Sequence, residues 1–533
     1  MNEQGISNKF GVPVSKTSPK ERIRELMAMR NEWKLYRRKC DATGKDIISA
    51  YAADAPFTIY KNDIWWGDTW DATQYGRDFD FTRPFFEQFA ELQKVVPREG
   101  TSVFNSENCD YNGHVRNSRN CYLNGLAANC EDLLYSYWMV NTKDTADSIF
   151  TNNSTLCYEC THGENLYDCI MVEESNGVSE SYFCYQMKGC DHCMFSANLN
   201  NKSYYLFNKP CTKEEFEVAK KKYINGSYQA FQEGVRQFEE IKSQTIRRAT
   251  NNVNCEDCAG DHMLNSRNCS DGYEVKDSED VYNTVSAANS KDIYSSYSAG
   301  WPACEEIYYC STTRGSMKCK FCYYCWTSSD LTYCENCVSS KDSFGCIGLR
   351  QKKYCILNKQ YTKEEYEALV PRIIEHMKTT GEWGEYFPHS LSSFAYNETS
   401  ANNFFPLTKE EAIHRGWRWK DEEKQEFLPA SVTSIPDKIA EVNSSITKEV
   451  LACQNCKRNY KIVPQELAFY QKQSLPVPHY CHICRHMRRL SLENPMELFD
   501  GHCNKCNAVI KTTYKPGHKE IVYCEKCYLE AVY

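Results

Sequence analysis

The sequence predicts a mainly β protein, in which two tandem β-solenoid lobes with helical caps precede two C-terminal zinc ribbons. Three observations lead to this prediction. A twelve-residue rhythm runs from about Ser106 to Gln360, a segment of nine such blocks occurs twice, and paired cysteines recur at the C-terminus. Self-similarity at a fixed period is the mark of stacked architectures, so it takes precedence over local propensities.

The rhythm forms two series of blocks. The first series begins at Ser106 and its last block begins at Lys202, while the second begins near Cys255 and its last block begins at Lys352, with one two-residue insertion before Cys304. The two last blocks and the residues that follow them are copies of each other. The chain therefore contains a duplicated array in which each block is one structural unit.

When the blocks are aligned, each position of the repeat forms a column, and the residue types in these columns indicate the secondary structure of a block. The third position is mostly Asn, Asp or Glu, which favours a turn. The fourth position is small or aliphatic and the seventh is small, mostly Cys, Ser or Thr, with aromatic residues between them. These residues are poor helix formers, which favours strands. One block per coil would give a perimeter of about 40 Å and an interior that admits only small side chains. Two blocks per coil is the alternative.

Each lobe needs a cover for its open end, because a bare terminal strand is an unpaired edge. Capping boxes at Thr212 with Glu215 and at Thr362 with Glu365 predict covering helices at about 213–223 and 363–379. A basic helix is expected at 21–38 and a bridging helix at about 228–248. The predicted domains are an N-terminal aromatic-rich region (1–104), the first lobe with its cap (105–225), a helical bridge (226–251), the second lobe with its cap (252–380), a linker region (381–448) and zinc ribbons at 449–492 and 493–533.

Composition favours a reduced cytoplasmic protein. The chain has 41% hydrophobic residues and a net charge of −8, no apolar run approaches the ~20 residues of a membrane span, and the first forty residues are charged rather than signal-like. We therefore expect no membrane partner. The 31 cysteines, an odd number, favour reduced thiols and metal sites over a disulfide framework.

The strongest chemical signal is a doubled set of four cysteines near the C-terminus. Each CxxC pair can chelate from a tight turn, and two such pairs complete a tetrahedron. Four thiolates leave no position for a catalytic water, so two structural zinc ions are the expected cofactors. Neighbouring His479, His482, His486 and His502 are interpreted as exposed polar residues, and the alternative is that one of them replaces a cysteine ligand. The predicted ligands are Cys453, Cys456, Cys481 and Cys484 for one ion and Cys503, Cys506, Cys524 and Cys527 for the other.

The cysteines outside these two sets are mostly expected to have structural roles. CxxC pairs inside the repeats follow from the fourth and seventh columns, so they are expected to be stacked core thiols, which pack as small hydrophobes. Cys40 has no partner cysteine at the spacing of a zinc knuckle, which favours a structural role. The best candidates for a further metal site are Cys319, Cys322, Cys325, Cys334 and Cys337.

The segment from Cys453 to Arg485 resembles a probable zinc-ribbon family of bacteria. It keeps two CxxC knuckles, a helix with Glu466, Phe469 and Tyr470, and the arginine that follows the last cysteine. The whole chain is similar to uncharacterised bacterial proteins that join such ribbons to cysteine-rich repeats, some of which are labelled type III CoA-transferases. The sequence contains no CoA-binding or acyl-transfer constellation, so the resemblance implies zinc binding and no known activity.

Charge suggests a role for the tail. From Leu451 onward there are 12 Lys/Arg against 7 Asp/Glu. The first hypothesis is a non-enzymatic zinc-binding scaffold whose tail contacts nucleic acid or ribonucleoprotein through phosphate groups. The alternatives are a protein–protein assembly scaffold without nucleic acid, and an enzyme, for which no nucleophile elbow, phosphate loop or open metal site is visible. The candidate nucleic-acid contacts are Arg485, Arg488, Arg489, Lys511 and Lys515.

Overall fold

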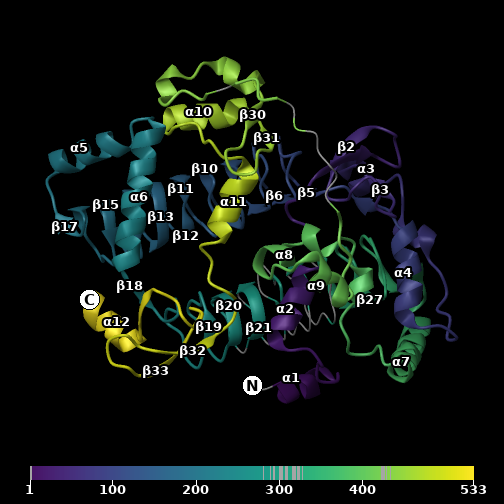
Figure 1. Ribbon diagram of the computed structural model, residues 1–533. Helices are drawn as coiled ribbons and strands as arrows, with labels where there is room; N and C mark the ends of the chain where they lie inside the picture. Colours follow the sequence, from purple (N-terminus) through teal and green to yellow (C-terminus); the bar gives the residue numbers. More distant parts are fainter. Residues whose placement is uncertain are drawn as a thin grey trace.

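The computed structural model describes residues 3–279, 281–288, 290–291, 295–298, 304–305, 310–314, 320, 325–326, 328–421, 427, 429–432 and 434–533. Strands account for 28% and helices for 27% of the structure. The content is therefore mixed rather than mainly β, because the N-terminal region, the expected linker and the C-terminal segments add helices to those that cover the strands (Figure 1).

A first stack of parallel strands occupies residues 102–210 and crosses the middle of Figure 1. Neighbouring strands pair at an offset of twelve residues, as Lys143 does with Thr155 and Cys157 with Cys169. One block therefore separates neighbouring strands, which excludes two blocks per coil for these pairs. The strands are β5 (Ser102–Phe104), β6 (His114–Arg116), β7 (Leu126–Ala128), β8 (Glu131–Leu134), β9 (Met139–Val140), β10 (Lys143–Ala146), β11 (Thr155–Tyr158), β12 (Thr161–Glu164), β13 (Tyr167–Asn176), β14 (Ser179–Tyr185), β15 (Asp191–Ala197), β16 (Ser203–Leu206) and the antiparallel β17 (Lys209–Pro210).

The backbone of this stack turns at every third residue. In the block that begins at Thr142, φ is 47° at Asp144, 51° at Asp147, 49° at Phe150 and 50° at Asn153. The turn predicted at the third position is confirmed, and three more turns occur in the same block. Asn and Asp tolerate this left-handed conformation well, whereas it is unusual for an aromatic residue.

Between the turns, every third side chain points into the stack and is buried. Ser148 shows how these small polar groups are satisfied: its Oγ donates to the Ala146 carbonyl (3.1 Å) and accepts from the backbone N–H of Cys160 in the next block (3.1 Å). The predicted packing of cysteines and hydroxyl residues is confirmed. Buried members of these columns include Cys121, Ser136, Ser148, Cys157, Cys160, Cys169, Ser181, Cys184, Cys193 and Ser196.

A second stack of parallel strands follows in residues 259–360. Most of its strand pairs also have an offset of twelve, as Lys341 with Lys353, whereas Ala259 pairs with Ser270 at an offset of eleven beside a register irregularity. The pairing of Ser290 with Cys304, an offset of fourteen, accommodates the predicted two-residue insertion. The strands are β19 (Ala259–Asp261), β20 (Ser270–Lys276), β21 (Tyr282–Ala288), β22 (Ser290–Lys291), β23 (Cys304–Glu305), β24 (Thr313–Arg314), β25 (Cys325–Trp326), β26 (Ser329–Thr332), β27 (Lys341–Phe344), β28 (Lys353–Ile356) and the antiparallel β29 (Lys359–Gln360).

The two predicted covering helices are confirmed as α5 (Lys213–Tyr223) and α7 (Lys363–Thr379), each with its capping box. Helix α6 (Tyr228–Gln244) lies across the first stack and contacts β14 and β15. Gly234 permits this approach, because a Cβ atom there would lie 2.7 Å from the ring of Phe183. After α6, the short strand β18 (Ile246–Arg248) leads to the second stack.

The N-terminal region departs from the prediction. The helix expected over 21–38 ends at Met27, because Tyr36–Lys39 pairs instead with Asp46–Ser49 in an antiparallel hairpin. Cys40 follows the first strand, is buried, and accepts a hydrogen bond from the Lys61 backbone N–H (3.3 Å), as its structural interpretation requires. The elements are α1 (Glu3–Phe10), α2 (Pro19–Met27), β1 (Tyr36–Lys39), β2 (Asp46–Ser49), β3 (Ile59–Tyr60), α3 (Asn62–Trp66), the 3-10 turn η1 (Ala72–Tyr75), α4 (Phe85–Val95) and β4 (Arg98–Glu99).

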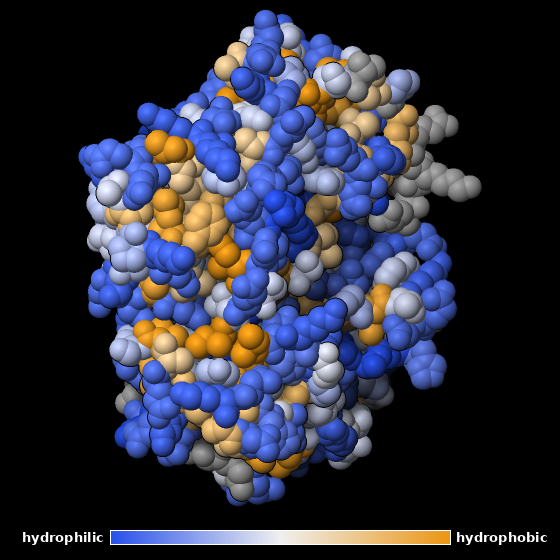
Figure 2. Space-filling view, turned by 60° about the vertical axis from the view of Figure 1, so that its left-hand side comes forward, coloured by the Kyte–Doolittle hydropathy of each residue, from blue (hydrophilic) through white to orange (hydrophobic). Residues whose placement is uncertain are grey.

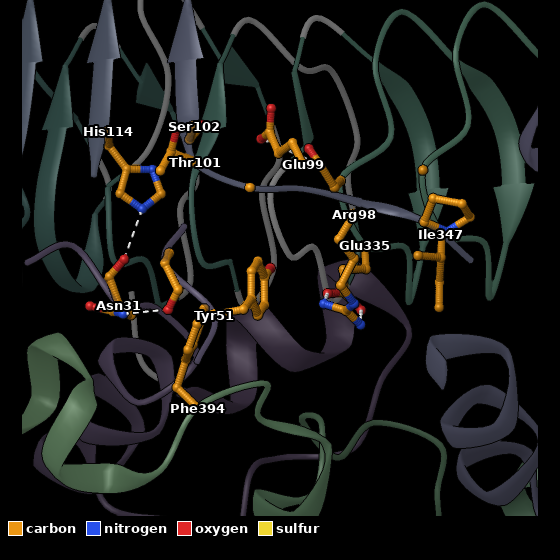
Figure 3. A pocket seen from close by; sticks show the side chains of 15 residues that line it. Asn31, Tyr51, Arg98, Glu99, Thr101, Ser102, His114, Glu335, Ile347 and Phe394 are labelled. Carbon is orange, nitrogen blue, oxygen red and sulfur yellow. Dashed lines mark hydrogen bonds and ion pairs between the residues drawn. The ribbon is translucent and has the colours of Figure 1, made fainter. Parts of the chain in front are cut away.

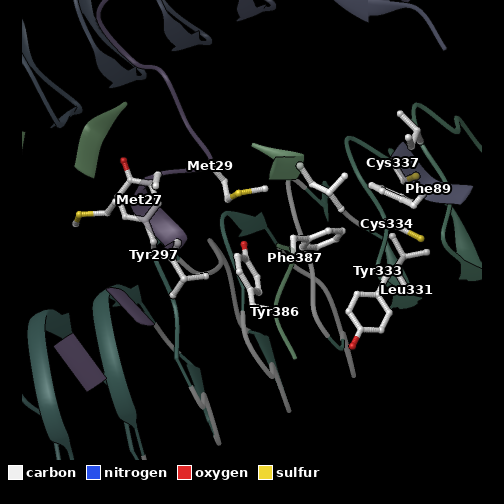
Figure 4. Close-up of a cluster of buried hydrophobic side chains, with 14 of the residues drawn as sticks. Met27, Met29, Phe89, Tyr297, Leu331, Tyr333, Cys334, Cys337, Tyr386 and Phe387 are labelled. Atoms are coloured by element: carbon white, nitrogen blue, oxygen red, sulfur yellow. The ribbon is translucent and has the colours of Figure 1, made fainter. Parts of the chain in front are cut away.

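One hydrophobic core joins this region to the second stack (Figure 4). Met27 and Phe89 from the N-terminal region pack in the same cluster as Tyr333 of the second stack and Phe387 of the expected linker. Residues 383–417 are therefore part of the core rather than a spacer. The elements between the second stack and the tail are η2 (His389–Leu391), η3 (Tyr396–Glu398), α8 (Ser400–Phe404), α9 (Lys409–His414), η4 (Ile439–Glu441) and η5 (Ser444–Lys448).

A small polar cavity of about 30 Å³ marks the same junction (Figure 3). Arg98 forms a buried ion pair with Glu335 of the second stack and donates to Ser393 Oγ (2.8 Å). Burial raises the pKa of the neighbouring Glu99 carboxyl to about 8. The N-terminal region thus binds the second stack through both apolar packing and buried charge.

Replacing Ser148 tests the inner columns. Ser148→Phe should lower the midpoint of thermal unfolding clearly, because overpacking a closed interior costs about 1–3 kcal/mol and the hydroxyl ladder is lost as well. Ser148→Cys is the matched control, since cysteine occupies the same column at Cys160 and Cys184. Equal melting temperatures for the two variants would contradict the packing described here.

Candidate metal centres

The first cysteine module (449–492) begins with a hairpin of β30 (Leu451–Ala452) and β31 (Asn459–Tyr460). Cys453 follows β30, and the Lys457 N–H donates to its carbonyl (3.0 Å), closing a tight turn that carries Cys456. After helix α10 (Pro464–Lys472), Cys481 is the residue immediately before helix α11 (His482–Leu490), so Cys484 lies in its first turn. The hairpin thus presents one CxxC pair, and the start of helix α11 presents the other.

The four sulfur atoms of this module lie within 4.8 Å of one another, and Cys456 Sγ is 3.7 Å from Cys481 Sγ. A tetrahedron with metal–sulfur bonds of about 2.3 Å has edges of about 3.8 Å. The predicted set of four cysteines is therefore brought together at a spacing that fits a metal ion.

Local donors favour the thiolate form that a metal requires. Burial alone would raise the pKa of Cys453, but backbone N–H groups of Cys481, Cys456 and Asn455 point toward its sulfur and bring that pKa down to about 6. The Cys481 N–H lies 3.2 Å from Cys453 Sγ. A thiolate is thus available at neutral pH.

The second cysteine module (493–533) repeats this construction. Cys503 follows the strand β32 (Phe499–His502), which pairs with β33 (Val509–Thr512), and Cys524 precedes helix α12 (Glu525–Val532). Cys506 Sγ is 3.8 Å from Cys524 Sγ, and all four sulfurs lie within 4.8 Å of one another. This site is more open than the first, since Cys506 is exposed.

The nearby histidines belong to neither cysteine group. Their interpretation as exposed residues is confirmed for His502 but is wrong for the other three, because His479 and His482 are half-buried and His486 is buried. The ring centroid of His486 lies 3.9 Å from that of Trp33. His479 stacks on Tyr228 at 3.6 Å, and His482 stacks on Tyr135. These rings serve packing because the module is docked on the rest of the protein.

Two of the arginines expected to contact nucleic acid are buried against the first stack. Arg485 lies 3.0 Å from the Asp147 carboxylate and 3.3 Å from that of Glu466, and its side chain is 4% exposed. The Arg489 side chain is 1% exposed, and its guanidinium group lies 2.9 Å from the Asp147 carboxylate and 3.3 Å from the Glu159 carboxylate. The expectation that both reach phosphate groups is therefore corrected, because their charge is used within the fold.

The remaining basic candidates lie at the surface. Arg488 is half-exposed and forms an ion pair with Glu159. Lys511 and Lys515 are exposed on the second module, and Lys511 pairs with Asp500 across the hairpin (2.7 Å). Of the five predicted contacts, these three keep access to solvent.

The second module joins the two stacks. Its strand β34 (Ile521–Tyr523) pairs with β18, and the Thr513 hydroxyl donates to Asp261 of the second stack (3.2 Å). On the other side, the Tyr528 hydroxyl lies 3.1 Å from Asn198 Oδ1 of the first stack. The C-terminal tail is thus an integral connector.

The suggested additional cysteine site falls partly outside the described residues and stays a prediction. Cys319 and Cys322 lie outside the described residues, and Cys325 is described only as part of β25. Cys334 and Cys337 are fully buried, and their thiols lie 3.5 Å and 3.6 Å from backbone carbonyls. Within the described residues, neither belongs to a group that can hold a metal ion.

A third group with ligand geometry was not predicted. His162 and Glu174 of the first stack and His262 of the second bring one ligand atom each within 4.8 Å of the others. The available signal in the sequence was that His162 and His262 are each followed twelve residues later by a glutamate, Glu174 and Glu274. The repeat period places such residues at equivalent positions of neighbouring blocks.

Comparison of the chain with protein families, with curated proteins and with solved structures yields no match. Among the helices in the described part of the chain, none has the length and apolar character needed to cross a membrane.

Substitution of one cysteine per module tests the two sites. Cys456→Ser and Cys506→Ser should each lower the metal content by one ion per chain relative to the unsubstituted protein, because three thiolates hold a metal more weakly than four. The measurement is elemental analysis after gel filtration. Cys211→Ser, outside both groups, should change nothing. Unchanged metal content in either module variant would contradict the assignment.

Proposed function

We propose that the protein is a non-enzymatic, zinc-stabilised scaffold for protein assembly. In this interpretation the two stacks of parallel strands are β-solenoid lobes, and the two cysteine modules are zinc ribbons that fix the lobes to each other. The twelve-residue offset, the repeated turns and the columns of small buried side chains support the solenoid. The sulfur-only ligand sets support zinc in a structural role, since no coordination position stays open.

The observation that carries the proposal is the burial of Arg485 and Arg489. An exposed basic cluster beside a zinc knuckle would favour phosphate binding. Here the two guanidinium groups instead neutralise Asp147, Glu159 and Glu466, and the Arg489 guanidinium also donates to the Tyr135 carbonyl (3.1 Å). The first ribbon therefore acts as an internal clamp on the first lobe, which leaves protein partners as the favoured class.

A rigid outer surface is the feature that such a scaffold offers. The face that carries α5, α6 and α12 is mostly hydrophilic with separate apolar patches (Figure 2). Exposed apolar side chains in these segments include Val218 (69% exposed) and Leu529 (39%). Small apolar patches in a polar surround suit reversible contacts between proteins.

A second candidate function is nucleic-acid docking through the second ribbon. It is favoured by one specific observation, the exposure of Lys511 and Lys515 beside a metal site. Since the whole chain carries a net charge of −8, such docking would depend on this local patch.

A salt titration separates the two functions. The full-length, metal-loaded protein should bind labelled single-stranded RNA and duplex DNA only weakly at low salt, and Lys511→Glu with Lys515→Glu should leave that binding unchanged. Fluorescence anisotropy at several salt concentrations measures it. Lys209→Glu with Lys213→Glu, at the far end of the first lobe, is the control. Tight binding that falls steeply with salt and is lost only in the Lys511/Lys515 variant would overturn the scaffold in favour of nucleic acid.

A further inference from the structure

We propose that the two lobes share a third metal site, built from His162, Glu174 and His262, that takes a divalent transition-metal ion through nitrogen and oxygen ligands. This inference goes beyond the proposed scaffold function and does not depend on it. The three ligand atoms converge within 4.8 Å, and they come from two different lobes.

The repeat explains why these side chains meet. Glu174 stands one coil after His162 in the first lobe, and Glu274 stands one coil after His262 in the second. All four residues occupy turns with positive φ, between 46° and 60°, so their side chains leave the corners of the coils. The contacts cross over: His262 Nε2 lies 3.0 Å from Glu174, and His162 Nδ1 lies 3.5 Å from Glu274.

The imidazole rings of His162 and His262 are stacked, with centroids 3.9 Å apart and planes inclined by 13°. Four carboxylates surround them, those of Glu174, Glu274, Glu493 and Asp261. Glu493, in the second ribbon, lies 2.6 Å from His162 Nε2, and Asp261 lies 3.5 Å from His262 Nδ1. In the described structure, the ion pairs of these four carboxylates are all with the two histidines.

The charges of this cluster suit a metal ion. Protonation of both histidines would stack two cations face to face, with ring centroids 3.9 Å apart. If both histidines are neutral, no ion pair of the described structure neutralises the four carboxylates. A divalent ion brings the same two positive charges to one point and leaves the imidazoles neutral, which is the form that binds a metal beside ionised carboxylate.

The site is accessible from outside the core. It lies on a cavity of about 700 Å³ between the lobes, which is also lined by Glu274, Lys276 and Tyr528. Three protein ligands leave coordination positions open, in contrast to the two ribbons. An ion held here would therefore present exchangeable positions to small oxygen ligands that enter the cavity.

A cobalt titration tests the site in the full-length protein with zinc in both ribbons. After dialysis against a weak chelator, the protein should bind one further equivalent of Co²⁺, and the absorption spectrum should lack the thiolate-to-cobalt charge-transfer band of a cysteine site. Glu174→Gln and His262→Gln should each weaken that binding at least tenfold. His192→Gln is the matched control, because His192 also lies beside two carboxylates, Glu180 and Asp191, but has no second histidine.

Retention of zinc in both ribbons shows that each variant is folded. The proposal is overturned if the unsubstituted protein binds no additional Co²⁺, if the bound ion shows thiolate charge transfer, or if folded Glu174→Gln and His262→Gln bind Co²⁺ as tightly as His192→Gln does. The first of these outcomes needs no variant, so a failure of the variants to fold leaves the test decisive.

Discussion

The offset of twelve residues between neighbouring strands is the constraint on which the rest of this structure depends. To return above its starting point in twelve residues, the chain turns at every third residue, and the side chains between the turns point into a narrow interior. Small groups fill most of it, together with larger apolar side chains such as Leu133, Leu166 and Met187. Each buried hydroxyl or thiol needs a hydrogen bond, and backbone groups of the same and the adjacent block supply it, as at Ser148. The left-handed turns cost free energy that this repeated bonding offsets.

The same constraint aligns the outer side chains in straight rows. The sixth position of successive blocks places Tyr135, Asp147 and Glu159 in one row under the first cysteine module, and Phe183 in the same row under α6. Although burial alone raises the pKa of Asp147, Arg485 and Arg489 bring it below its usual value. Without them a buried charge would be left uncompensated, at a cost of about 3–5 kcal/mol. These buried ion pairs therefore bind the first cysteine module to the first stack.

Much of the fold and both cysteine sites could be predicted from the sequence. The features that could not be predicted depend on contacts between distant segments. The period, the capping boxes at Thr212 and Thr362, and the two sets of four cysteines are local signals, and the structure contains each of them. The burial of Arg489 is a contact over more than 300 residues that no local pattern encodes. Turns at residues such as Phe150 run against intrinsic preference, because stacking overrides it. The cluster around His162 and His262 depends on how the two stacks meet, which no local pattern encodes.

The most direct test of whether the first cysteine module clamps the first stack is a double-mutant cycle, with amide hydrogen exchange in residues 143–164 as the measurement. Asp147→Asn and Arg489→Met should each lower local protection by about 3–5 kcal/mol, and together by about 1–3 kcal/mol less than the sum, because the two groups pair directly. Arg488→Met, at a half-exposed position, should have little effect. Additive losses within about 0.5 kcal/mol, or unchanged protection, would show that the first cysteine module does not hold the first stack through this pair.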